Sequence, residues 1–161
     1  DHRIAEYLRE FCERVDGYKV GLDQGVARAF LVERGLSEHL PSVRMSDGTL
    51  KFLCLLAVML NPDPPPVVCL EEPEQGLHPE AIRLLGRLLI EASERMQVIC
   101  TTHSPALIDA ISEMPEAVVV CERVDDGTQF RRLKLSDLDE WLDRYSLGEL
   151  WRKGEIGGNP A

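Results

Sequence analysis

The sequence is poor in positive charge. Among its 161 residues, 18 are lysine or arginine and 28 are aspartate or glutamate, which leaves a net charge of −10. No lysine or arginine lies between Lys51 and Arg83. Because phosphate contacts need clusters of basic side chains, the composition argues against direct nucleic-acid binding by this chain. The acidic stretch between these two residues suits a divalent cation instead.

Paired cysteines and long apolar runs are also lacking. The cysteines stand apart among apolar residues without a C-x-x-C pair, so we expect buried free thiols in a reducing, cytoplasmic compartment. They are Cys12, Cys54, Cys69, Cys100 and Cys121. The longest apolar run, Phe52 to Leu60, is too short to cross a bilayer, and we recognise no signal peptide. We therefore predict no membrane segment, and we interpret the start at Asp1 as truncation or processing.

The sequence does contain alternating helix and strand patterns. Apolar periodicity predicts helices over 2–15, 50–60, 79–95, 105–111 and 136–145. Short β-prone runs predict strands over 18–22, 26–33, 67–70, 97–100, 117–121 and 129–135. The order strand, helix, strand, helix, strand from position 67 onward predicts a largely parallel sheet with right-handed crossovers. The first two strands would form an appended antiparallel hairpin, and the last would pair with 120–124 across a turn.

The most informative segment runs from Val67 to Pro79. Its apolar strand ends in two adjacent carboxylates, Glu71 and Glu72, which such a strand would deliver to the edge where open α/β sheets bind ligands. Successive side chains of an extended chain point to opposite sides, so one carboxylate could hold a metal ion while the other handles a water molecule. A tight turn follows, and Pro79 suits the first position of a helix.

Two further segments flank this one. Ser46-Asp47-Gly48-Thr49 leads into the apolar helix over 50–60, and Thr102-His103-Ser104 follows the strand over 97–100. With these segments in this order, the chain resembles the C-terminal half of an ATP-binding-cassette-type ATPase head of the SMC, RecF and OLD class. The match covers 43–111, and more loosely 147–151 and 154–160.

Four motifs of that class have counterparts in this sequence. Ser46 to Thr49 resembles the signature motif, and Val67 to Glu72 resembles Walker B with its catalytic glutamate. Gln75 to His78 resembles the D-loop, and Thr102 to Ser104 resembles the switch-histidine loop. The resemblance implies an α/β P-loop NTPase fold, in which a mainly parallel sheet is flanked by helices and carries an N-terminal helix and antiparallel hairpin.

The same resemblance implies one partial ATPase domain over 1–161. Residues 1–44 would form the helix and hairpin, 45–135 the lobe that carries the four motifs, and 136–161 a helical tail. ATP and Mg²⁺ would be the ligands.

Roles follow residue by residue from the resemblance. Glu71 would bind the metal ion, Glu72 would act as general base, and His103 would sense the γ-phosphate. Ser46 and Gly48 would contact the nucleotide bound on a second head, with His78 nearby, so that two copies dimerise through the signature loop.

Plainer interpretations exist for each of these residues. Glu71 could cap the neighbouring turn, Glu72 could be a solvent-facing acid, and His103 could be structural. The segment beginning at Ser46 could be only a capped helix start, and His78 only a turn residue before a proline.

One motif of the class is missing. The sequence contains no Gly-x-x-x-x-Gly-Lys-Ser/Thr segment, so the phosphate cradle and its Mg²⁺-binding hydroxyl are lacking. We expect an N-terminal Walker A portion of the same protein to supply them, and this chain alone to be inactive. A partner such as a nuclease is a further expectation.

Two other functions stay open. The chain could be a non-catalytic regulatory or scaffold module with a degenerate ATPase fold. It could also be a metal-dependent hydrolase or nuclease that uses Glu71, Glu72 and His103 directly.

Overall fold

Helices and strands alternate along the chain, and the computed structural model describes residues 2–23, 25–142 and 144–158. The first part contains α1 (His2–Phe11), β1 (Val15–Asp23), β2 (Val26–Glu33), β3 (Leu40–Pro41), a 3-10 turn (Ser42–Arg44), α2 (Asp47–Met59), β4 (Val67–Glu71), α3 (Pro79–Ser93), β5 (Gln97–Thr101) and α4 (Pro105–Ala110). The second part contains a 3-10 turn (Pro115–Ala117), β6 (Val119–Val124), β7 (Gly127–Arg132), a 3-10 turn (Leu135–Asp137), α5 (Asp139–Leu142) and α6 (Leu147–Arg152).

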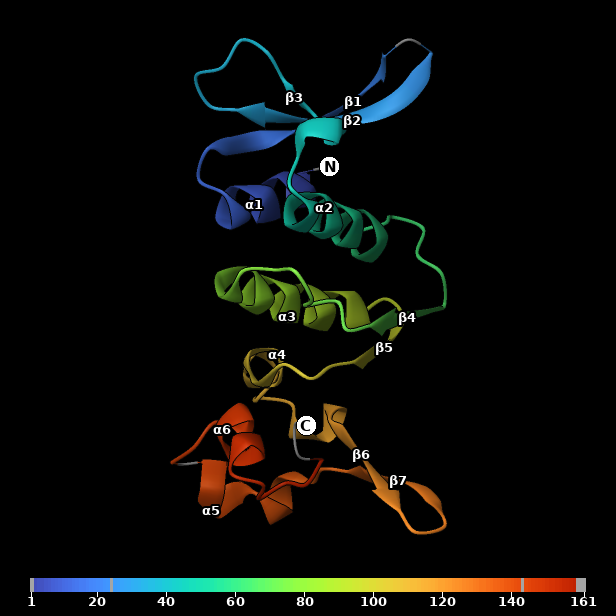
Figure 1. Cartoon of the computed structure of the whole chain (residues 1–161), viewed down its shortest axis with the longest axis vertical. Helices are drawn as coiled ribbons and strands as arrows, with labels where there is room; N and C mark the ends of the chain where they lie inside the picture. The colour runs from blue at the N-terminus through green and yellow to red at the C-terminus, as the bar shows by residue number, and fades with distance from the viewer. Residues whose placement is uncertain (1, 24, 143, 159–161) are drawn as a thin grey trace.

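The strands of the described residues form three sheets. Figure 1 shows them spaced along the molecule, with antiparallel β1-β2-β3 at one end, parallel β4-β5 beside α3, and antiparallel β6-β7 at the other end. This α/β architecture, including the N-terminal helix and hairpin, confirms the predicted fold class. The predicted antiparallel pairing of 129–135 with 120–124 is confirmed by β6 and β7. The expectation that the strand at 117–121 continues the parallel sheet is wrong, because among the described residues β6 pairs with neither β4 nor β5. A partner across a short turn costs little loop-closure entropy.

One hydrophobic core holds α1, α2 and α3 together. Five side chains at its centre, from α2 and α3, have no exposed surface: Phe52, Leu56, Met59, Leu85 and Leu88. From α1, the ring of Phe11 stacks on Phe52 with 4.5 Å between ring centroids. The first helix ends at Phe11, four residues earlier than predicted, because Val15 is buried as a strand residue paired with Glu33. Tertiary pairing overrides the helical periodicity at this point.

Polar contacts on the surface of this core also tie α1 to α3. Both the Arg3 guanidinium and the Tyr7 hydroxyl donate hydrogen bonds to the carboxylate of Glu91, the latter at 2.9 Å. The hydrogen bond from Arg3 lowers the pKa of Glu91. Burial, and then the hydrogen bond to Glu91, raises the pKa of Tyr7 to about 12. These contacts fix how the N-terminal helix lies on α3.

A second core lies on the other side of α4. Ile108, Leu147, Leu150 and Trp151 are buried in it, whereas Leu107, the residue before Ile108, is buried in the first core. α4 therefore has one face in each core and joins them.

The C-terminal helix α6 packs directly on α4. The backbone N–H of Gly148 donates to Asp109 Oδ1 at 2.7 Å, and a β-carbon at position 148 would lie 2.4 Å from the carbonyl oxygen of Pro105. A capping box formed by Ser146 and Glu149 begins this helix. This capping box was not among the features that we predicted from the sequence.

The predicted helix over 136–145 is wrong in extent. In its place lie the 3-10 turn Leu135–Asp137 and the four-residue helix α5, with no side-chain cap at the start of the turn. Residues 143 and 159–161 of the predicted tail lie outside the described residues. The three-part division of the chain stays a prediction.

The second helix and the parallel strand pair both leave apolar side chains partly exposed. Leu50 and Val58 of α2 are 37% and 43% exposed, although both belong to the apolar helix predicted over 50–60. On β4 and β5, Val67 and Ile99 are 42% and 50% exposed, while alternate residues such as Leu70 pack on the first core. Hydropathy identifies apolar residues but not the face on which a neighbour lies.

For the same reason, the prediction that the cysteines are buried is wrong. All five are free, but three are exposed, because they lie on outward faces of α2, β4 and β6: Cys54, Cys69 and Cys121. Within the described ranges, none of the helices has the length and apolarity needed to cross a membrane.

Gly86 sets how closely α3 approaches α4. A β-carbon there would lie 2.4 Å from the β-carbon of Ala110. We predict that Gly86→Ala lowers the free energy of unfolding by about 1–2 kcal/mol, because overpacking outweighs the higher helix propensity of alanine. Urea unfolding of wild type, Gly86→Ala, Ala110→Gly and the double variant would measure this. The two changes should be coupled by more than about 0.5 kcal/mol, and additive effects would contradict the contact.

Candidate functional site

The pairing of β4 with β5 brings two distant segments to one edge of the sheet. The strands are parallel and in register from Val67 opposite Gln97 to Glu71 opposite Thr101. Since both strands end at the same level, the acidic turn after β4 and the loop that carries His103 lie beside each other. This placement agrees with the predicted arrangement.

Glu72 lies in an unusual backbone conformation at this edge. Its φ is 42°, and it is the one non-glycine residue with positive φ in the described ranges. Its N–H still donates to the carbonyl oxygen of Thr101 at 3.0 Å, but the extended chain ends at Glu71. The alternation of side chains that we expected along the strand therefore stops before Glu72.

The side chain of Glu72 faces His103. Its Oε1 lies 3.7 Å from His103 Nε2, longer than a hydrogen bond but within reach of an ion pair when the imidazole is protonated. The side-chain amide of Gln75 donates to the other carboxylate oxygen. The Glu72 side chain is 28% exposed, against 73% for His103. The structure thus brings together the predicted base and the predicted phosphate sensor.

Glu71 lies beside this pair and faces solvent. Its carboxylate has no hydrogen-bond or ion-pair partner in the described part of the chain. Across residues 2–23, 25–142 and 144–158, no group of three His, Cys, Asp or Glu side chains could hold a metal ion. The Glu71 carboxylate is accessible to a ligand from solution.

The beginning of α2 is fixed against the same turn. Lys51 Nζ donates to the carbonyl oxygens of Glu72 and Gln75, at 3.3 and 2.9 Å. A β-carbon at Gly48 would lie 2.8 Å from the carbonyl oxygen of Gly76, so only glycine fits there without a shift. The signature segment is therefore held next to the acidic turn. We predicted no role for Lys51 from the sequence. A single lysine in an otherwise apolar helix could have indicated that this residue has a polar partner.

Ser46 and His78 both cap helices. Ser46 Oγ accepts from the N–H of Thr49 at 3.2 Å, and His78 Nδ1 accepts from the N–H of Glu80 at 3.4 Å. Ser46 rather than Asp47 is the N-cap of α2. The Ser46 residue and the His78 side chain are exposed as well, so capping and ligand contact are compatible roles.

The loop after β5 is ordered by side chains of its own. Ser104 caps α4 by accepting from the N–H of Leu107 at 3.3 Å. The Thr102 hydroxyl does not cap this helix. It donates to the buried carboxylate of Glu74. We assigned no role to Glu74, and only its position next to Pro73 in the acidic turn could have singled it out.

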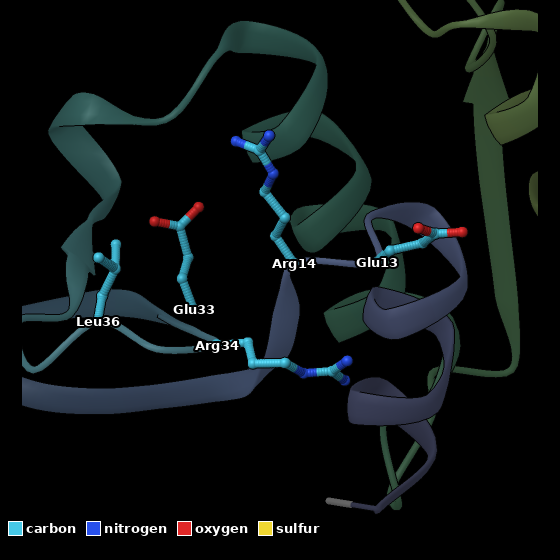
Figure 2. Close-up of a pocket in the computed structure, with 5 residues that line it drawn as sticks. All are labelled: Glu13, Arg14, Glu33, Arg34 and Leu36. Carbon is cyan, nitrogen blue, oxygen red and sulfur yellow. The ribbon is translucent and has the colours of Figure 1, made fainter.

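A hollow at the base of the β1-β2 hairpin contains none of the predicted site residues. Glu13, Arg14, Glu33, Arg34 and Leu36 line it, and Figure 2 shows that they come from the turn between α1 and β1 and from β2 with the turn after it. Arg34 donates to Asp16 at 3.1 Å. The chemistry of the predicted site lies elsewhere, at the ends of β4 and β5.

Comparison with known proteins identifies the family. Residues 3–109 match a family model described as "AAA domain, putative AbiEii toxin, Type IV TA system". The chain belongs to this AAA domain family. An OLD nuclease from Thermus scotoductus is 35% identical over 86 residues, which cover 50% of this chain and 16% of the nuclease. The match therefore spans about a sixth of that relative's length.

Solved structures of SMC ATPases share the fold. One, from work on the ATP-driven dimerization and DNA-stimulated activation of SMC ATPases, has a TM-score of 0.64 at 15% identity and covers 88% of both chains. An Smc head bound to the C-terminal winged-helix domain of ScpA has a TM-score of 0.67 at 14% identity, covering 86% of this chain and 43% of that one. This AAA domain thus has the P-loop NTPase fold of SMC heads, and the predicted resemblance to SMC and OLD ATPases is confirmed.

The left-handed backbone of Glu72 predicts that a glycine at this position would make the fold more stable than an alanine. Glycine adopts positive φ without a steric penalty, whereas other residues lose about 1 kcal/mol or more there. We expect Glu72→Gly to have a higher free energy of unfolding than Glu72→Ala by about 1 kcal/mol, because both lack the carboxylate and only alanine keeps the strain. Urea unfolding of the two variants gives the comparison. Equal stabilities, or a more stable alanine variant, would contradict it.

Proposed function

We propose that this AAA domain is the C-terminal part of an ATPase that binds and hydrolyses ATP at the interface of two heads. The observation that carries the proposal is the approach of Glu72 and His103 to 3.7 Å at the shared end of two parallel strands. Open α/β sheets bind ligands at this edge. Hydrolysis of ATP needs a positioned water molecule and charge neutralisation, both of which such an edge can supply.

Three side chains would divide the work within one head. The Glu72 carboxylate would orient the attacking water and accept its proton, and the His103 imidazole would donate a hydrogen bond to the γ-phosphate. The unpaired, exposed carboxylate of Glu71 fits a hard cation such as Mg²⁺, which prefers oxygen ligands. Bound Mg²⁺ would neutralise charge on the phosphates.

A second copy of the head would complete the site. Ser46, Gly48 and His78 would face the nucleotide held by the partner, where helix N-termini favour anions. The exposure of Ser46 and of the His78 side chain supports this role. So does the fold shared with SMC ATPases for which ATP-driven dimerization is described.

The phosphate cradle would come from an N-terminal Walker A portion of the same protein. The uncovered apolar faces of β4-β5 and α2 support this, because parallel sheets are normally covered on both faces. Without that portion, we expect no ATP hydrolysis.

A nuclease is the partner or linked domain that we propose for the ATPase. The relative from Thermus scotoductus is an OLD nuclease, and this chain matches only a small share of it. The net charge of −10 supports our prediction that the nucleic acid is not bound by this chain itself. A reducing, cytoplasmic location remains part of the proposal.

The role of Glu72 can be tested in the whole protein. Glu72→Gln should keep ATP binding and lower turnover by about 10²–10⁴-fold, because the amide cannot accept the proton of water. In the presence of ATP, a stable dimer of this variant should then accumulate. Calorimetry, phosphate release and size-exclusion chromatography would measure the three effects. Glu94→Gln, an exposed acid after α3, is the matched control.

Two outcomes would count against the proposal. Unchanged turnover in Glu72→Gln would remove Glu72 as the base. A whole protein that binds no ATP–Mg²⁺ would favour the non-catalytic regulatory module.

Docking of the Walker A portion makes a separate prediction about Ile99. In this chain alone, Ile99→Glu should change the free energy of unfolding by less than about 0.5 kcal/mol, since the side chain is half exposed. In the whole protein it should abolish nucleotide binding, because an unpaired charge would be buried between the two portions. Val124→Glu, with 46% exposure on β6, should be harmless in both settings. Thermal unfolding and calorimetry would decide, and normal nucleotide binding by the Ile99 variant would contradict this docking face.

A further inference from the structure

Glu74 is the one charged residue that is buried in the described part of the chain, with 8% exposure. Burying a carboxylate costs free energy unless hydrogen bonds compensate. An apolar residue of similar length would fill the same space without this cost. The presence of a carboxylate therefore needs an explanation beyond packing.

The side-chain hydrogen bonds of Glu74 all go to the loop that carries His103. Its Oε1 accepts from the Thr102 hydroxyl and, at 3.2 Å, from the backbone N–H of His103. Thr102 Oγ1 in turn accepts from the backbone N–H of Ser104 at 2.9 Å. The amides of His103 and of the next residue are thus held by a chain of hydrogen bonds that starts at Glu74.

The same residue is rigidly attached to the acidic turn. The carbonyl oxygen of Glu74 accepts from the N–H of Leu77 at 3.0 Å, within a turn in which the N–H of Gln75 donates to the carbonyl oxygen of Glu72 at 3.1 Å. Glu74 lies two residues after Glu72. It therefore connects the backbone that presents Glu72 to the backbone that presents His103.

His103 has little else to hold it. Its side chain is 73% exposed, and Glu72 is its one ion-pair partner among the described residues. The direction of the imidazole is set by the backbone of residues 102–104, which Glu74 orders. The second oxygen of Glu74, Oε2, is buried and has no hydrogen-bond partner in the described ranges. All of the hydrogen bonding by this carboxylate thus goes to the His103 loop.

We propose that Glu74 is a positioning residue that holds the His103 loop at its working distance from Glu72. This rests on the proposed ATPase function, in which the two side chains act on one phosphate. In this role Glu74 acts through the loop and not directly on the nucleotide or the attacking water. It acts by accepting hydrogen bonds, so an acceptor oxygen is the property that matters.

The first test uses amide hydrogen exchange of this chain, observed by NMR without nucleotide. Glu74→Met removes the acceptor and the buried charge, so the fold should be as stable as wild type or more so. Exchange of the His103 and Ser104 amides should become about tenfold faster or more, because a hydrogen bond to a charged group is lost. Glu74→Gln keeps an acceptor oxygen and should restore most of the protection. The Leu77 amide bonds to the Glu74 backbone and is the internal control.

The second test uses turnover by the whole protein. Glu74→Met should lower kcat with little change in KM for ATP, and Glu74→Gln should recover most of kcat. A purely structural role would instead lower stability and leave this pattern absent. If the methionine variant does not fold, Thr102→Val serves instead, since it should speed exchange of the Ser104 amide alone.

The results separate the two proposals. Unchanged exchange of the His103 and Ser104 amides in Glu74→Met, or of the Ser104 amide in Thr102→Val, would overturn the positioning role even if the whole protein is an ATPase. Faster exchange with no ATP hydrolysis by the whole protein would keep the loop contact but overturn the role in catalysis.

Discussion

The parallel pairing of β4 with β5 is the constraint on which the site depends. Two segments about thirty positions apart in sequence end at the same level because their strands run side by side in register. α3 makes this possible, because this helix connects the end of β4 to the beginning of β5 and so allows the two strands to run parallel. If the register slipped by one residue, the side chains would exchange faces and Glu71 would turn toward the first core.

The turn after β4 combines features that are unfavourable for stability alone. Glu72 has a backbone conformation that glycine would adopt more easily, and Glu74 places a carboxylate in the interior. Lys51 and the close contact of Gly48 with Gly76 offset these costs by fixing the turn against α2. Such strain persists where surrounding contacts determine the geometry, and it is common at functional sites.

The surfaces of the chain point to a larger assembly. One face of β4-β5 packs on the first core, and the other exposes apolar side chains such as Val67 and Ile99. In the C-terminal tail, by contrast, α6 packs on α4 through the Gly148 hydrogen bond and the second core. The tail thus supports the helix that follows His103.

The sequence alone determined the elements and the order of the motifs. The apolar run before Glu71, the turn before Pro79 and the strand before His103 are local patterns, so their structure followed from period and composition. The close approach of Glu72 and His103 could be expected as well, because parallel strands align their ends.

Only the tertiary structure decided what depends on neighbours in space. The end of α1 at Phe11, the separation of β6 from the parallel β4-β5 sheet and the exposure of Cys69 are settled by contacts between distant segments. The left-handed backbone of Glu72 and the burial of Glu74 have the same origin. Local periodicity indicates which residues prefer the interior. Burial and hydrogen bonding depend on which distant segments pack against those residues.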